Sequence, residues 1–101
     1  MYKRQEYYDA SYNKGVMYLN RVSEIVKELD GVYKPSIIEK REAEIKVEYL
    51  KAIKEFEHVF SNNDDMDMES KVELAKTMKK IYARLEQMDK YNEMKSFIES
   101  N

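Results

Sequence analysis

The chain has 101 residues, 43% of them hydrophobic, which is the size of one domain with enough apolar side chains to build a core. It contains no cysteine, which excludes disulfides, thiolate chemistry and cysteine-based zinc sites. Two glycines and one proline favour helices over a turn-rich strand fold, and the net charge of −2 argues against a basic protein that coats nucleic acid.

The location and source of the protein can only be inferred from composition. No apolar run approaches the roughly 20 residues of a membrane span, and the first residues lack the apolar block of a signal peptide. We therefore expect a cytoplasmic protein with no membrane contact. Little alanine, with much Lys, Glu, Tyr, Asn and Met, is typical of AT-rich genomes, and this suggests a phage or another mobile element as the source.

Residues 6–30 carry the first helical pattern, because apolar residues recur at alternating spacings of four and three. Asp30 and Gly31 end it, since glycine commonly follows the last residue of a helix. Gly15 lies inside the pattern, where glycine costs about 1 kcal/mol relative to alanine. It is either a tolerated weak point or a place where a second backbone, from this chain or another subunit, comes close. The stripe consists of Tyr8, Tyr12, Gly15, Leu19, Val22, Val26 and Leu29.

A second apolar line on the same helix, about 100° from the first, consists of Tyr7, Tyr18 and Ile25. One partner helix would not cover both lines. Either a third helix buries the second line, or the line is a binding surface. Tyrosine suits a binding surface because it offers a large contact area at low entropic cost and keeps a polar hydroxyl group.

Residues 37–60 form the clearest helical pattern. Ser36 and Glu39 have the spacing of a capping box, with Pro35 just outside the helix. His58 points away from the apolar stripe, so we expect it on the solvated surface. No second histidine or set of carboxylates stands at ligand spacing, and we expect no metal site and no cofactor. The stripe consists of Ile45, Tyr49, Ala52, Phe56 and Val59.

The segment that follows is rich in acidic residues. Asn63, Asp65 and Asp67 alternate as in a calcium loop, but Met68 stands where that loop needs glycine and Leu74 where it needs a bidentate glutamate. We expect instead that these acids cap the next helix and complement its positive N-terminal end.

Residues 67–90 form the third helical pattern, with a stripe of Leu74, Met78, Ile81, Leu85 and Met88. Beyond Met88 the apolar residues move about 100° around the helix, to Tyr91, Met94 and Ile98. Residues 91–100 therefore extend the third helix past a kink, form a short fourth helix, or pack on another neighbour such as a second chain.

Basic residues follow one side of this third helix. Residues 71–84 contain five basic residues and one acidic residue, and Lys76, Lys80 and Arg84 are spaced four apart with Lys79 adjacent. Such a row can follow the phosphates of a nucleic acid, and it can equally be the solvated face of an amphipathic helix. No helix-turn-helix spacing or glycine-rich phosphate loop accompanies it.

These patterns predict a single all-α domain over residues 1–101, folded as an antiparallel up-down-up three-helix bundle that a short fourth helix can complete. Without cysteine, and with one exposed histidine, we expect no enzyme. We expect an interaction protein that binds another protein as an adaptor, assembly factor or inhibitor, with a slight preference for a homodimer. The candidate contacts are Tyr7, Tyr18, Ile25, Tyr91, Met94 and Ile98. The alternative is nucleic-acid binding through Lys76, Lys79, Lys80 and Arg84.

Overall fold

The computed structural model describes residues 2–62 and 66–101, with residues 2–9 as backbone only. Helices α1 (Tyr2–Glu28), α2 (Pro35–Asn62), α3 (Met68–Arg84) and α4 (Met88–Ser100) account for nearly all of these residues, which include no strand. The all-α prediction is confirmed. Residues 91–100 belong to a separate helix, so the short fourth helix is the alternative that forms.

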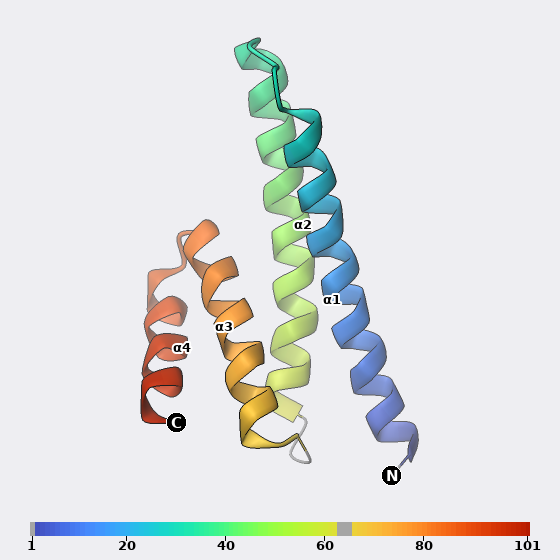
Figure 1. Ribbon diagram of the computed structural model, residues 1–101, viewed down its shortest axis with the longest axis vertical. Helices are drawn as coiled ribbons and strands as arrows, with labels where there is room; N and C mark the ends of the chain where they lie inside the picture. The colour runs from blue at the N-terminus through green and yellow to red at the C-terminus, as the bar shows by residue number, and fades with distance from the viewer. Residues whose placement is uncertain (1, 63–65) are drawn as a thin grey trace.

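The helices run in alternating directions, and each packs on the one before it in the chain (Figure 1). The expected three-helix bundle is not confirmed. Helix α3 packs against α2 and α4, and among the described residues its backbone does not contact that of α1. The Cα positions extend over 49 × 30 × 16 Å with a radius of gyration of 15.3 Å. A compact chain of this length would have a radius of about 13 Å, so the molecule is elongated.

The elongation comes from the hairpin of α1 and α2, whose far half projects beyond α3 and α4 (Figure 1). Val22 and Ile25 are buried in the seam between the two helices of this hairpin. Val26 was expected in the core stripe but is 54% exposed, because no third helix reaches this part of the hairpin. The far half is therefore only two helices thick.

The main core lies where α2, α3 and α4 meet. The periodic residues Phe56, Val59, Leu74, Met78 and Ile81 are buried there, as their helical spacing predicted. Packed around them are Ala52, Ile53, Ala75, Tyr82, Leu85 and Met94.

Gly15 lets the core extend onto α1. A Cβ atom at Gly15 would lie 2.6 Å from two ring carbons of Phe56, closer than any real contact. Phe56 is fully buried, and its ring also meets the Tyr12 ring edge-on with centroids 5.6 Å apart. The close approach expected at Gly15 is therefore made by a side chain of the same protein rather than by a second backbone.

The turn between α1 and α2 matches one expected signal and departs from another. Gly31 has a φ of 81°, a left-handed conformation that glycine adopts without steric cost, and it follows the end of α1 as predicted. The Lys34 carbonyl accepts the first hydrogen bonds of α2, from the N–H groups of Ile37 and Ile38, so Pro35 is the first helical residue. Ser36 lies inside the helix, and the capping box predicted there was wrong.

The turn between α3 and α4 has the hydrogen bonds of a Schellman motif. The Gln87 N–H donates to the Tyr82 carbonyl at 2.9 Å, and the Glu86 N–H donates to the Ala83 carbonyl at 3.2 Å. Glu86 has a φ of 60° at the position that glycine usually occupies. This turn ends α3 at Arg84, six residues before the predicted end.

Candidate functional site

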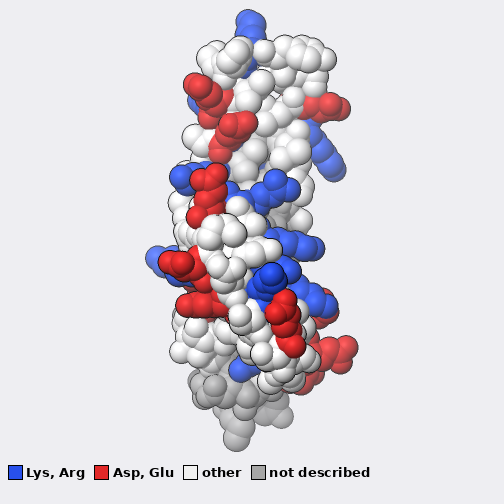
Figure 2. All heavy atoms as spheres, turned by 90° about the vertical axis from the view of Figure 1, so that its left-hand side faces the viewer, with Lys and Arg blue, Asp and Glu red and all other residues white. Residues whose placement is uncertain are grey.

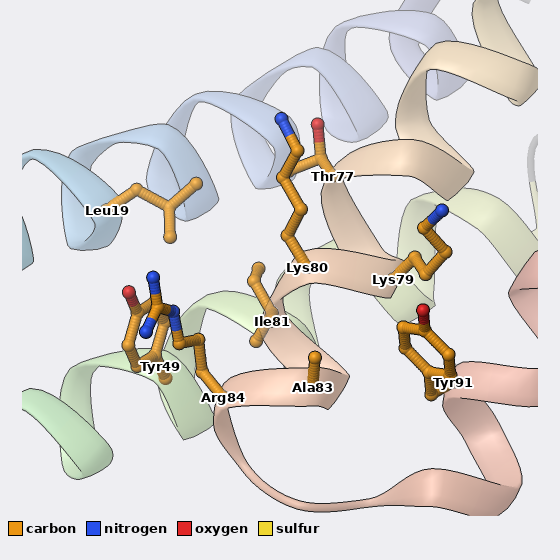
Figure 3. A pocket seen from close by; sticks show the side chains of 9 residues that line it. All are labelled: Leu19, Tyr49, Thr77, Lys79, Lys80, Ile81, Ala83, Arg84 and Tyr91. Carbon is orange, nitrogen blue, oxygen red and sulfur yellow. The ribbon is translucent and has the colours of Figure 1, made fainter.

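A shallow hollow of about 700 Å³ lies along the C-terminal half of α3. Leu19 of α1 and Tyr49 of α2 border it on one side of α3, and Tyr91 of α4 borders it on the other (Figure 3). The hollow therefore draws on all four helices. Its remaining lining residues are Thr77, Lys79, Lys80, Ile81, Ala83 and Arg84.

The lining has three basic side chains and no acidic one, although the whole protein has a net charge of −2. The Lys79 Nζ atom lies 5.9 Å from the centre of the Tyr91 ring, at cation–π distance. Lys80 and Arg84 are exposed and form no ion pair with the described residues. The lining of the hollow is thus locally positive. Figure 2 shows basic side chains, with acidic ones among them, at mid-height on the side of the molecule that carries α3 and α4.

The predicted row of basic residues is only partly available. The Lys76 Nζ lies 3.1 Å from Glu73 Oε1, one turn earlier on α3, and Lys76 is not among the residues that line the hollow. Lys79, Lys80 and Arg84 do line it, so three of the four predicted cations come together. Their contact with a nucleic acid stays a prediction.

The predicted protein contacts are spread over different environments. Tyr91 is half-buried at the hollow, and Ile98 is half-buried against the core. Tyr18 is also half-buried, with the Lys51 Nζ 5.8 Å from the centre of its ring. Ile25 and Met94 are only 7% and 8% exposed, so their side chains are used in packing within the chain. The Tyr7 side chain lies outside the described part of the structure.

A polar cluster that the sequence did not reveal joins α2, α3 and α4. The Tyr82 hydroxyl donates to Glu57 Oε2 at 2.6 Å, and the Lys90 Nζ lies 3.2 Å from the same oxygen. Burial, with the Glu57 carboxylate adjacent, raises the pKa of Tyr82 well above its usual value. Since each partner is on a different helix, no local spacing could have predicted the cluster. It fixes α4 against the core.

The acidic segment before α3 acts as expected where the structure describes it. Asp67 is the N-cap of α3, and its Oδ1 accepts a hydrogen bond from the Ser70 N–H at 2.7 Å. Hydrogen bonds from Ser70 lower the pKa of Asp67. Asn63 and Asp65 lie outside the described residues. Among the residues described, no three His, Cys, Asp or Glu side chains come together in a group suited to a metal ion.

His58 is half-buried rather than fully exposed, beside a second shallow hollow that includes Ser11 and Asn62. None of the described helices is both long and apolar enough to cross a membrane.

Comparison of the chain with known protein families, with curated proteins and with solved structures finds no match.

Proposed function

We propose that this chain is a non-enzymatic protein that binds another protein, as an adaptor, assembly factor or inhibitor, through the hollow along α3. The observation that carries the proposal is the lining of this hollow. It combines two tyrosines and an arginine, which are enriched at protein interfaces, with the apolar residues Leu19, Ile81 and Ala83.

The lining residues and the open shape of the hollow also favour binding over catalysis. Its lining contains no histidine and no carboxylate, so it offers neither of the commonest general acid–base groups. The hollow is shallow and open, which suits a macromolecular surface better than a water-excluding reaction site.

The exposed apolar residues at the far end of the hairpin support an additional proposal, self-association. Val26 and Ile37 are 54% and 42% exposed, and Tyr33 in the connecting turn is 88% exposed. These residues lie in the part of the hairpin that is only two helices thick. A second copy would cover them, and we propose a homodimer on this basis.

A second candidate function is nucleic-acid binding through Lys79, Lys80 and Arg84, which are close together and lack acidic neighbours in the hollow. It ranks lower for two reasons. The ion pair of Lys76 with Glu73 removes one member of the predicted row. The apolar residues around the remaining cations cannot form hydrogen bonds with phosphate or sugar groups.

Affinity purification of the tagged chain from the cells that make it tests the proposal. The double variant Lys80→Glu/Arg84→Glu serves as the disrupted form. Lys54→Glu is the matched control, because Lys54 is an exposed lysine on α2 that lines the second hollow instead. We expect a protein to co-purify with the wild type and with Lys54→Glu, to be lost from the double variant, and to be retained after nuclease treatment.

Two other results would count against the proposal. Bound material that absorbs at 260 nm and disappears with nuclease would move nucleic-acid binding to first place. Elution of the chain with no bound protein, at the single-chain mass of 12.2 kDa, would contradict both protein binding and the homodimer.

A further inference from the structure

We infer that the hollow along α3 receives an acidic amphipathic helix of the partner protein. This inference rests on the proposed function and names the chemistry of the segment that is bound. It is carried by the charge of the hollow, by its apolar surface and by the spacing of its cations.

The charge of the hollow selects an acidic segment. Three cations of the hairpin are used in ion pairs, since Arg41 pairs with Glu28 and Glu44, and Arg21 and Lys51 flank Glu48. Lys80 and Arg84 have no such acid among the described residues and project from exposed positions on α3. An acidic partner would supply the missing counter-charges, whereas a basic partner would be repelled.

The apolar residues of the hollow select a segment with a hydrophobic side. Leu19 and Tyr49 are half-buried in the free protein, and Ile81 lies at the base of the hollow. A bound segment with apolar residues would complete the burial of Leu19 and Tyr49. A polar acidic loop would instead leave these surfaces in contact with water.

The arrangement of groups selects a helix rather than an extended peptide. The fold offers no sheet edge among its described residues, and the hollow is lined by residues of helices, whose backbone N–H and C=O groups are largely paired within each helix. A helix satisfies its own backbone hydrogen bonds, so it can lie on such a surface without loss. The Cβ atoms of Lys80 and Arg84, one turn apart on α3, are about 5–6 Å from each other, and two acids four residues apart on a partner helix have the same spacing.

The bound segment therefore has a definable pattern. It carries two Asp or Glu residues four positions apart, and its apolar residues, spaced three and four positions from one another, lie along an adjacent face. About two to three turns are enough, because the lining residues of α3, from Thr77 to Arg84, extend over about 11 Å.

Selection from a displayed library of random peptides tests this pattern. The peptides are about 16 residues long, or about four helical turns. The wild-type chain is the target, and the Lys80→Gln/Arg84→Gln variant removes peptides that bind elsewhere. We expect the retained peptides to carry the acidic amphipathic pattern. A synthetic peptide with the retained sequence should become helical on binding, as measured by circular dichroism.

Affinity measurements on that peptide complete the test. We expect binding to weaken about three- to tenfold when its two acids become Gln, and by a similar factor with the Lys80→Gln/Arg84→Gln chain. Lys54→Gln, which changes a cation of the second hollow, should leave the affinity unchanged. Retained peptides without acids, peptides that bind in an extended form, or the absence of any retained peptide would overturn the inference.

Other occupants of the hollow give distinct results. Random-sequence single-stranded DNA that binds with a steep salt dependence, lost in the Lys80→Gln/Arg84→Gln chain, would assign the hollow to nucleic acid. A doubled mass that this same variant reduces to 12.2 kDa would assign it to a second copy. If a protein co-purifies with the chain but tolerates Lys80→Glu/Arg84→Glu, protein binding stands and only its assignment to this hollow fails.

Discussion

The contact between Gly15 and Phe56 allows a test in which the sign of a stability change reveals the packing. Gly15→Ala in an unobstructed helix interior would stabilise the protein by about 1 kcal/mol. Here the new Cβ atom would lie 2.6 Å from the Cε1 and Cζ atoms of Phe56, where ordinary contacts begin at 3.4 Å. The ring or α1 would have to move by 3.4 − 2.6 = 0.8 Å.

The ring cannot easily make this movement, because Phe56 is fully buried and lies edge-on against Tyr12. Overpacking of a core costs about 1–3 kcal/mol. Taking about 2 kcal/mol for the strain and subtracting about 1 kcal/mol for the gain in helix propensity, we expect Gly15→Ala to destabilise the protein by about 1 kcal/mol. The melting temperature should fall by roughly 4–8 °C.

The control is the same change in a Phe56→Leu background, which removes the ring atoms that the new methyl group would meet. There Gly15→Ala should stabilise the protein by about 1 kcal/mol, so its effect changes sign. The coupling of about 2 kcal/mol exceeds the roughly 0.5 kcal/mol expected for independent sites. Urea denaturation followed by circular dichroism measures all four proteins. Equal stabilisation in both backgrounds would refute the packing of α1 against Phe56.

Three further predictions concern the helix ends and the polar cluster. Glu86→Gly should stabilise the protein by about 1 kcal/mol in urea denaturation, and Gly31→Ala should destabilise it by a similar amount, because both positions have left-handed backbones. Asp67→Ala should lower the melting temperature at neutral pH. This loss should fade as the pH falls below 3.8, because the pKa of Asp67 is lowered in the folded protein and the ionised carboxylate contributes its full stability only above that value. Asp67→Asn should retain most of the cap. Tyr82→Phe should cost about 1 kcal/mol by removing the hydrogen bond to Glu57. Because the pKa of Tyr82 is raised, its contribution is present below pH 10.0 and lost above it, so pH titration of the variant should show a smaller alkaline loss.

The helical periodicity of the sequence predicted the fold class and most of the core. Phe56, Met78 and Ile81 are buried as expected, because their spacing of three and four places them on one helix face whatever the neighbours are. The Gly31 stop was predicted because glycine is the residue that left-handed turns favour. These features depend on local geometry, which a single sequence carries.

The end of α3 could not be predicted in the same way. The residue in its left-handed turn is Glu86, which gives no sequence signal for a helix end. The shift of the apolar residues to Tyr91, Met94 and Ile98 was the remaining signal that the helix changes there. A short fourth helix was among the explanations given for that shift. Met94 is buried because α4 folds back on α3, and the local spacing of residues does not predict that arrangement.

The candidate site could be predicted only in part, because local spacing groups residues of one helix but not residues of different helices. The cations Lys79, Lys80 and Arg84 share a helix with one another, so their grouping was visible in the sequence. Leu19 and Tyr49 belong to other helices, and their periodicity assigned both to the core.

Early termination of α3 links the shape of the protein to its proposed function. If α3 had continued to residue 90 as predicted, six more residues would have extended it by about 9 Å, and α4 could not have turned back at Glu86. Because the turn at Glu86 ends α3 at Arg84, the three cations Lys79, Lys80 and Arg84 lie in the last two turns of the helix. An acidic helix bound in the hollow would lie beside these two turns and would cover Leu19 and Tyr49, which are half-buried. Its negative side chains would face the two cations, Lys80 and Arg84.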